Sequence, residues 1–238
     1  MPTVERRSPS RRAGALLGSA LALLTAYLAL SVDAVHHHLL LSLDGDVRAL
    51  VQPLRSHALD LSMQTVSLLG EPAGLIPLIG VASLALWRAS RRWALLLPVL
   101  MAGAGALQLA GKWAADRPRP NAAPWGFPSG HVLTLAVFFG IAAFLVVTLT
   151  ERRRRDRLLA CGSCAVAVGL VAVSRIYLDM HWLSDVLGGF VLGTAYLLIA
   201  IYLSQRVDVW RERAVAGAVP RPVEGFPLEL TAPPAPET

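Results

Sequence analysis

Three short segments of the chain carry residue types that together can bind and transfer a phosphoryl group. The first places Lys112, the only lysine, seven residues before Arg119, and the second is a Pro-Ser-Gly-His run that ends at His131. In the third, Arg175 precedes His181 by six residues. Cations bind phosphate oxygens, and a histidine either attacks phosphorus or passes a proton to a leaving group. Charged groups in an apolar chain are seldom kept without a function, so we expect one common site.

The third segment is the most specific, because Asp185 follows His181 by four residues. Residues at this spacing share a helix face, provided that the last helix begins early. A carboxylate there would keep one imidazole nitrogen protonated and leave the other free to attack, as in a catalytic triad. The helix dipole also favours an acid near a helix N-terminus, which would explain Asp185 alone. It does not explain three such segments occurring together.

The first two segments are expected to hold the phosphate. Prolines at 118 and 120 place Arg119 in a stiff loop, after a helix that ends near Lys112. Ser129 starts a long apolar run and is expected to cap a helix, whose free N–H groups bind anions, and Gly130 allows a close approach. Taken singly, Lys112 is also explained as a capping cation, and Ser129 as a plain cap beside an interfacial His131.

The elements that must position these residues are membrane-spanning helices. Hydrophobic residues make up 55% of the 238 residues and charged residues 16%, whereas a soluble domain carries about a quarter charged residues. The mean hydropathy is +0.54. Six apolar stretches approach the ~20 residues that cross a bilayer: 13–32, 72–88, 93–111, 129–149, 158–174 and 184–204. We therefore expect an all-α bundle of six transmembrane helices.

Positive charge is concentrated on one side of this topology. Sixteen of the 22 Lys and Arg residues fall in the N-terminus, the second-to-third and fourth-to-fifth connections, and the C-terminal tail. The positive-inside rule then places both termini in the cytoplasm and all three motif segments on the outer face. The arginine run at 152–157 is interpreted as a topology anchor at anionic head groups, not as a nucleic-acid site. Cys161 and Cys164, in an apolar run, are interpreted as packing residues.

The remaining segments divide the chain into three parts. Residues 1–12 are expected to be a basic cytoplasmic N-terminus, residues 13–204 the membrane domain, and residues 205–238 a disordered cytoplasmic tail. Segment 33–71 joins the first two spans on the outer side. Apolar residues there recur at helical spacing among charged ones, which predicts a short amphipathic helix in the interface, started or kinked by Pro53.

The motif segments resemble the type 2 phosphatidic acid phosphatase family, whose pattern is Lys-x6-Arg-Pro, Pro-Ser-Gly-His and Ser-Arg-x5-His-x3-Asp. Each motif is complete in this chain: Lys112 to Arg119-Pro120, Pro128 to His131, and Ser174-Arg175 to His181 and Asp185. The resemblance covers residues 112–185 by motif and 13–204 by topology. It implies a membrane phosphatase that acts on lipid phosphates.

The resemblance also implies a role for each site residue. His181 would be the nucleophile that forms a phosphohistidine, Asp185 would orient it, and His131 would protonate the leaving oxygen and then activate water. The groups implied to hold the phosphoryl oxygens are Lys112, Arg119, Ser129, the Gly130 amide and Arg175. Since the protein supplies the cations, neither a metal nor a cofactor is expected. The implied partners are the bilayer and a lipid phosphate or diphosphate, such as undecaprenyl diphosphate, phosphatidic acid or phosphatidylglycerol phosphate.

Three other functions remain compatible with parts of this pattern. A lipid phosphotransferase would pass the phosphoryl group from the same phosphohistidine to an acceptor other than water. A vanadium-dependent haloperoxidase could use a similar anion site, although six spans and the lack of a large soluble domain argue against it. A catalytically silent scaffold would not need the intact set of His131, His181 and Asp185.

Overall fold

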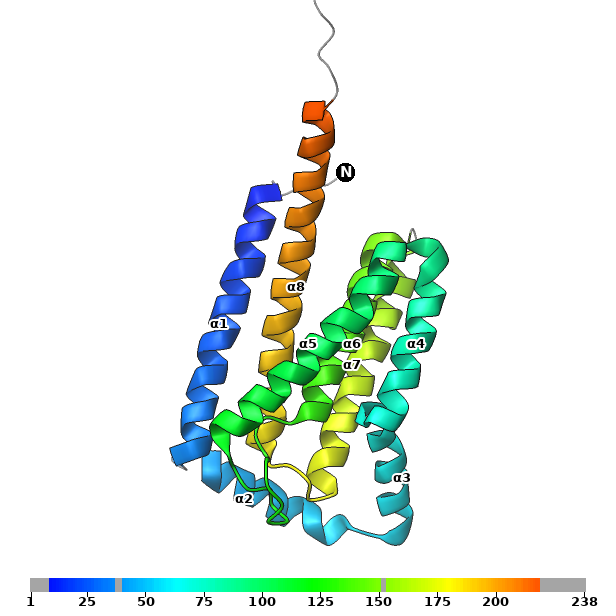
Figure 1. Ribbon diagram of the computed structural model, residues 1–238. Coiled ribbons are helices and arrows are strands. Elements are labelled where there is room, and N and C mark those ends of the chain that lie inside the picture. Colours follow the sequence, from blue (N-terminus) through cyan, green and yellow to red (C-terminus); the bar gives the residue numbers. More distant parts are fainter. Residues whose placement is uncertain (1–8, 37–39, 151–152, 219–238) are drawn as a thin grey trace, which may run out of the picture. The chain divides into compact units, whose positions relative to one another are not determined.

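The computed structural model describes residues 9–36, 40–150 and 153–218, and the regular structure in these ranges is helical. The order of elements along the chain is as follows: α1 (Pro9–His36), α2 (Leu40–Val51), the 3-10 turn η1 (Gln52–Leu54), α3 (His57–Ser67), the 3-10 turn η2 (Leu68–Gly70), α4 (Pro72–Ala89), α5 (Arg91–Ala115), α6 (Gly130–Leu149), α7 (Arg154–Tyr177) and α8 (Leu183–Ala218). Figure 1 shows their arrangement.

Six helices in the described part of the chain are long and apolar enough to cross a membrane, namely α1, α4, α5, α6, α7 and α8. They coincide with the six stretches expected from the sequence and extend past most of them by a few residues. The expected fold class, an all-α bundle with six candidate spans, is therefore confirmed. Helix boundaries reach further than apolar runs because polar residues at the ends continue the backbone hydrogen bonding into the interfacial region.

Helix α6 forms the centre of the apolar core. Its side chains at Leu133, Leu135 and Ile141 are fully or almost fully buried, and it packs against both α5 and α7. Helix α8 approaches α6 closely at two small residues. A Cβ atom at Gly193 would lie 2.7 Å from the backbone oxygen of Leu133, and one at Gly189 would collide with the backbone oxygen of Ser129. This spacing is the small-xxx-small pattern of close helix contacts in membranes, and it brings the start of α6 against the start of α8.

The segment between α1 and α4 differs from the single amphipathic helix expected from the sequence. It contains two α-helices, α2 and α3, which η1 separates, and η2 follows α3. The break occurs at Pro53, which lies inside η1 and cannot continue the hydrogen bonding of α2. Ser56 then starts α3, because its side chain accepts a hydrogen bond from the Leu59 N–H. Helix α3 packs against α7, and α2 contacts both α1 and α7.

The chain divides into two compact units, Met1–Tyr202 and Leu203–Thr238. In the second unit α8 continues to Ala218, through the first part of the tail that we expected to be disordered. Six of the sixteen residues 203–218 are Arg or Ala, which favour a helix, and Pro220 follows. The remainder of the expected tail, residues 219–238, and most of the expected basic N-terminus, residues 1–8, lie outside the described residues.

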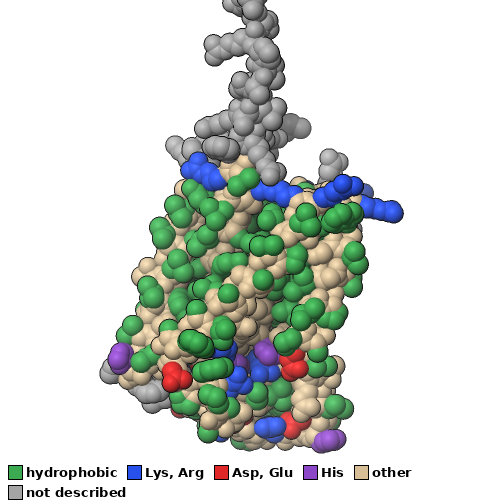
Figure 2. Space-filling model, viewed as in Figure 1, with side chains coloured by type: hydrophobic (Ala, Val, Ile, Leu, Met, Phe, Trp, Pro, Cys, Tyr) green, Lys and Arg blue, Asp and Glu red, His purple; other side chains and the backbone are tan. Residues whose placement is uncertain are grey.

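Charged side chains gather at the two ends of the first unit. The turn between α4 and α5 carries Arg88, Arg91 and Arg92, and the start of α7 carries another group of arginines at the same end. Arg152, which belongs to that second group in the sequence, lies outside the described residues. Figure 2 shows Lys and Arg side chains at this end, a broad apolar surface next to it, and a hollow with basic, acidic and His side chains toward the other end.

Candidate active site

The hollow is a cavity of about 740 Å³ that contains most of the residues singled out from the sequence. Six of the eight expected site residues line it: Lys112, Arg119, Gly130, His131, Arg175 and His181. They come from the last turn of α5, the following loop, the first turn of α6, the last turn of α7 and the loop before α8. The other two, Ser129 and Asp185, are buried directly next to lining residues.

His181 and Asp185 form a buried pair. His181 Nδ1 lies 3.3 Å from Asp185 Oδ2, which also accepts a hydrogen bond from the Trp182 N–H at 3.0 Å. Helix α8 begins only at Leu183, so His181 belongs to the preceding loop, yet the spacing of four residues still joins the two side chains. With Nδ1 directed at the carboxylate, Nε2 is the ring nitrogen that remains for chemistry in the cavity.

Burial keeps the imidazole of His181 neutral. It lowers the pKa of His181 to about 4, Asp185 partly opposes this, and the positive charges of Lys112 and Arg175 lower it further. At a pH below this pKa, the imidazole would carry a proton on both nitrogens and could not attack phosphorus. At physiological pH the ring is therefore in the form that a nucleophile requires.

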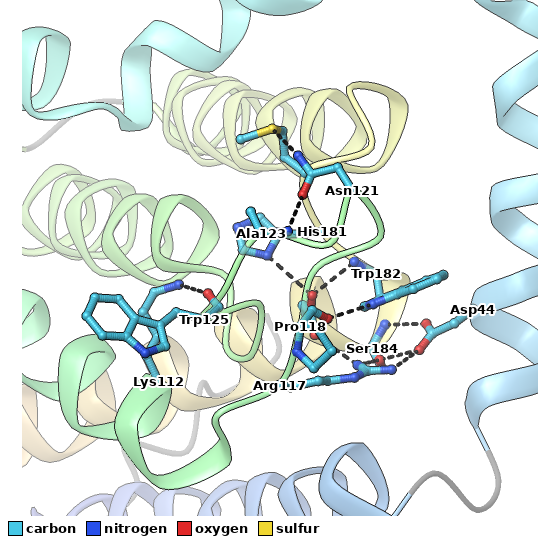
Figure 3. Close-up of polar contacts among 12 residues, drawn as sticks. Asp44, Lys112, Arg117, Pro118, Asn121, Ala123, Trp125, His181, Trp182 and Ser184 are labelled. Atoms are coloured by element: carbon cyan, nitrogen blue, oxygen red, sulfur yellow. Dashed lines mark hydrogen bonds and ion pairs between the residues drawn. The ribbon is translucent and has the colours of Figure 1, made fainter.

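The three expected phosphate-binding cations are anchored by the protein in different ways. Lys112 donates from Nζ to the backbone oxygen of Trp125 at 2.6 Å, as Figure 3 shows. Arg175 donates from Nη1 to Ser67 Oγ at 2.5 Å. Arg119 lies in the loop after α5, where a turn is closed by the hydrogen bond from its N–H to the Ala123 oxygen at 2.8 Å. The first two contacts hold the side chains of Lys112 and Arg175, and the third holds the backbone of Arg119; none of the three involves a carboxylate.

His131 and Ser129 stand at the beginning of α6. Ser129 occupies the N-cap position as expected, but its hydroxyl makes no capping hydrogen bond, which corrects the interpretation of it as a plain cap. The ring of His131 packs against the backbone of η2. A Cβ atom added at Gly70 would lie 2.6 to 2.9 Å from three atoms of this side chain, so a residue larger than glycine at position 70 would displace the imidazole.

Four buried polar atoms of the site have no hydrogen-bond partner among the described residues. They are Arg119 Nε, Ser129 Oγ, His131 Nε2 and Arg175 Nε, and the described part of the chain contains only one further atom of this kind, Ser83 Oγ. Buried polar groups are nearly always hydrogen-bonded. All four can donate to an oxyanion when His131 is protonated at Nε2. The donors therefore fit a phosphate group, with arginine geometry matched to its oxygens.

Sequence reasoning missed three residues behind the His181–Asp185 pair. Arg117, which is 4% exposed, donates from Nη1 to Asp185 Oδ1 at 2.9 Å and to Ser184 Oγ at 2.6 Å. Its Nη2 donates to Asp44 Oδ2 at 2.8 Å. Figure 3 shows Asp44, Arg117 and Ser184 meeting in this network. The available signal was an acid in α2 that recurs at helical spacing with Arg48 and Gln52.

The fold and the site together define a class of protein: a helical integral membrane protein with a cavity lined by cationic side chains and histidines. The comparisons with known proteins agree. The sequence pattern of the PAP2 superfamily matches residues 93–208. The chain is 30% identical to phosphatidylglycerophosphatase B of Bacillus subtilis (strain 168) over 189 residues, which cover 76% of this chain and 92% of the relative.

Two further similarities, one to a human protein and one to a solved structure, cover very different shares of the chain. The chain is 33% identical to sphingosine-1-phosphate phosphatase 2 of Homo sapiens over 102 residues, or 38% of this chain and 24% of that protein. The crystal structure of a transmembrane PAP2-type phosphatidylglycerolphosphate phosphatase from Bacillus subtilis has a TM-score of 0.73 at 24% identity, covering 79% of this chain and 97% of that chain. The second similarity shows the fold.

This chain belongs to the PAP2 superfamily. It is a multi-pass membrane phosphatase of the type that hydrolyses lipid phosphates, as the motifs indicated.

Proposed function

We propose that the protein hydrolyses a lipid phosphate or diphosphate through a phosphohistidine on His181. The observation that carries this proposal is the cavity, in which His181, Arg119, His131 and Arg175 line one part beside an apolar wall, with Ser129 buried next to them. That wall is made by residues of α4 and α5, among them Leu75, Ile79 and Met101. A phosphate group fits the polar part, and a lipid tail fits the apolar part.

In the first step, Nε2 of neutral His181 attacks phosphorus. The P–N bond forms while the bond between phosphorus and the lipid oxygen breaks. His131, as an imidazolium with a proton on both ring nitrogens, gives its Nε2 proton to the departing oxygen and becomes neutral, and the lipid alcohol or lipid monophosphate leaves. The imidazole of His181 becomes positively charged as the bond forms, and Asp185 stabilises that charge through Nδ1.

In the second step, water attacks the phosphohistidine. His131, now neutral, takes a proton from the water, the P–N bond breaks, and inorganic phosphate leaves with His181 restored. Lys112, Arg119 and Arg175 stabilise the negative charge on the phosphoryl oxygens in both steps. Because phosphoryl transfer depends mainly on positioning and charge stabilisation, these three cations can supply what a metal supplies elsewhere.

Phosphatidylglycerol phosphate is the substrate we propose first, because the Bacillus subtilis relative that the chain matches over 92% of its length is a phosphatidylglycerophosphatase. Undecaprenyl diphosphate and phosphatidic acid carry the same combination of a phosphate group and apolar tails. The test is phosphate release from a panel of these lipids in detergent with EDTA present and no added acceptor. Release without an acceptor supports a hydrolase, whereas transfer that requires a second lipid or a sugar supports a phosphotransferase.

We also propose that the site opens on the outer face of the cell membrane, with both termini in the cytoplasm. The arginines of the α4–α5 turn and of the start of α7 lie at one end of the helices, and the cavity lies toward the other. The positive-inside rule assigns the arginine-rich end to the cytoplasm. A lipid substrate would then present its head group in the outer leaflet.

A further inference from the structure

One face of α2 is polar and docks on the loop that carries the proposed nucleophile. Asp44, Arg48 and Gln52 are spaced four residues apart and therefore follow one another along this side of the segment. Arg48 pairs with Asp179 through two hydrogen bonds, both of 2.7 Å, and Gln52 donates to the same carboxylate at 3.3 Å. The guanidinium of Arg48 also lies 5.8 Å from the ring centroid of Trp182, the residue after His181.

Asp44 makes the deepest of these contacts. Its carboxylate is 2% exposed, and Oδ1 accepts the backbone N–H of Ser184 at 2.8 Å. Ser184 is the second residue of α8, where a helix leaves its N–H groups without partners. Asp44 therefore caps α8 from another helix. Its Oδ2 accepts hydrogen bonds from Ser184 Oγ at 2.6 Å and from Arg117 Nη2 at 2.8 Å.

We infer that Asp44 is a positioning residue for the reaction, acting through Arg117 on the Asp185–His181 pair, and that α2 is the element that holds this pair in its reactive geometry. This inference rests on the proposed role of His181. Arg117 holds Oδ1 of Asp185, so that Oδ2 is directed at His181. Arg117 is in turn held in place by Asp44. The chain of contacts runs without a gap from α2 to the imidazole.

The charges of the network explain why a second carboxylate is useful. Arg117 alone against Asp185 would be a buried ion pair that neutralises the carboxylate and weakens its attraction for a positively charged imidazole. With Asp44 on its other side, the guanidinium divides its interaction between two acids, and Asp185 keeps more of its negative charge available to His181. Removing one partner of such a buried group leaves an uncompensated charge, which is strongly destabilising.

The test uses the full-length protein in detergent and compares Asp44→Asn with Asp46→Asn. Asn keeps the size of the side chain but loses its charge, and Asp46 is an exposed acid on the same helix. We expect Asp44→Asn to lower kcat by about 10- to 100-fold, by analogy with the loss seen when a residue that orients a metal-binding side chain is removed. KM and inhibition by inorganic phosphate should stay within about twofold, because the three phosphate-binding cations are untouched. Asp46→Asn should behave as the wild type.

A double variant separates positioning from a general effect on folding. Arg117→Gln leaves the carboxylates of Asp44 and Asp185 buried without their shared cation, so it should lower kcat more than Asp44→Asn does. Adding Asp44→Asn to Arg117→Gln removes one of the two acids and should raise kcat again. The inference would be overturned if the two single substitutions lowered kcat equally and the loss in the double variant were the product of the two single losses. It would also be overturned by an Asp44→Asn enzyme with wild-type kcat.

If Asp44→Asn does not fold, Arg48→Gln decides the question. The side chain of Arg48 is 42% exposed, so the substitution is tolerable, yet it removes the double hydrogen bond that holds the loop at Asp179. We expect a fall in kcat of about threefold or more, smaller than for a buried pair because exposed ion pairs are weak, with KM unchanged. An unchanged kcat, or a rise in KM with kcat unchanged, would overturn the role of α2.

Discussion

Replacing Asp185 by Asn perturbs the proposed nucleophile without changing the shape of the site. Both carboxylate oxygens are used: Oδ2 accepts from His181 Nδ1 at 3.3 Å and from the Trp182 N–H at 3.0 Å, and Oδ1 accepts from Arg117 at 2.9 Å. An amide has one oxygen and one NH2 group. Whichever way it turns, the NH2 group meets a donor in a buried position.

The two orientations of the amide differ in how many hydrogen bonds they lose, and this difference predicts which tautomer His181 adopts. Arg117 can only donate hydrogen bonds, so the amide oxygen is expected to turn toward Arg117, and the NH2 group then faces His181. A neutral imidazole can accept at Nδ1, but only if its proton moves to Nε2, the nitrogen that should attack. The wrong tautomer in a catalytic triad lowers kcat by about 10⁴-fold, and at about 1.36 kcal/mol per tenfold this corresponds to ~5.4 kcal/mol of lost transition-state stabilisation.

The assay is phosphate release from phosphatidylglycerol phosphate in detergent, with kcat and kcat/KM measured for the wild type, Asp185→Asn and Asp116→Asn. Asp116 is an exposed acid at the end of α5 with φ of 41°, a backbone conformation that Asn adopts well, so its variant controls for the substitution itself. We expect near-normal turnover for Asp116→Asn. A loss of kcat smaller than tenfold in Asp185→Asn would refute the orienting role and leave Asp185 as a structural residue.

Three further predictions concern the cations, the orientation and the general acid. Activity should survive EDTA and be blocked by vanadate, because the cavity presents fixed cations to the phosphate; loss of activity on chelation with recovery in Mg²⁺ would contradict this. With both native cysteines removed, Ala122→Cys should react with a membrane-impermeant thiol reagent on intact cells, whereas Ala89→Cys should react only after lysis. Both positions are exposed in the structure. The reverse labelling pattern would place the site inside the cell. Gly70→Ala should lower kcat about tenfold or more, because its methyl group would push against the His131 ring. Gly80→Ala is the control and should keep its activity, because the space around Gly80 is open. Equal activities of the two variants would show that the reaction does not depend on the exact position of His131.

The fold and the composition of the cavity were accessible from the sequence because both depend on local patterns. Six apolar stretches of membrane-spanning length predict six helices. Prolines and helix ends place the charged segments in connections on one side. The spacing of four residues between His181 and Asp185 predicts their contact, although the helix starts two residues after His181. These signals lie within single segments and need no knowledge of tertiary packing.

The contacts that hold the site residues in place could not be predicted from the sequence. Asp44 and Arg117 are 73 residues apart, and their contact depends on how α2 docks, which no local pattern encodes. The amphipathic spacing of the outer segment predicts an interfacial helix but not the partner of its polar side, which in the structure binds the loop and the helix start around His181. Likewise, Ser129 has the sequence context of a cap, and only the structure shows that its hydroxyl does not cap the helix.

The central claim is that His181 carries the phosphoryl group during turnover, and trapping the intermediate tests it most directly. The wild-type enzyme should be mixed with a substrate labelled in the phosphate, quenched within one turnover under alkaline conditions, and digested for mass spectrometry. The account predicts an acid-labile phosphate on Nε2 of His181, because Nδ1 faces Asp185, and no label in His181→Ala, which should also release no phosphate. Label on His131, or steady turnover by His181→Ala, would contradict the account.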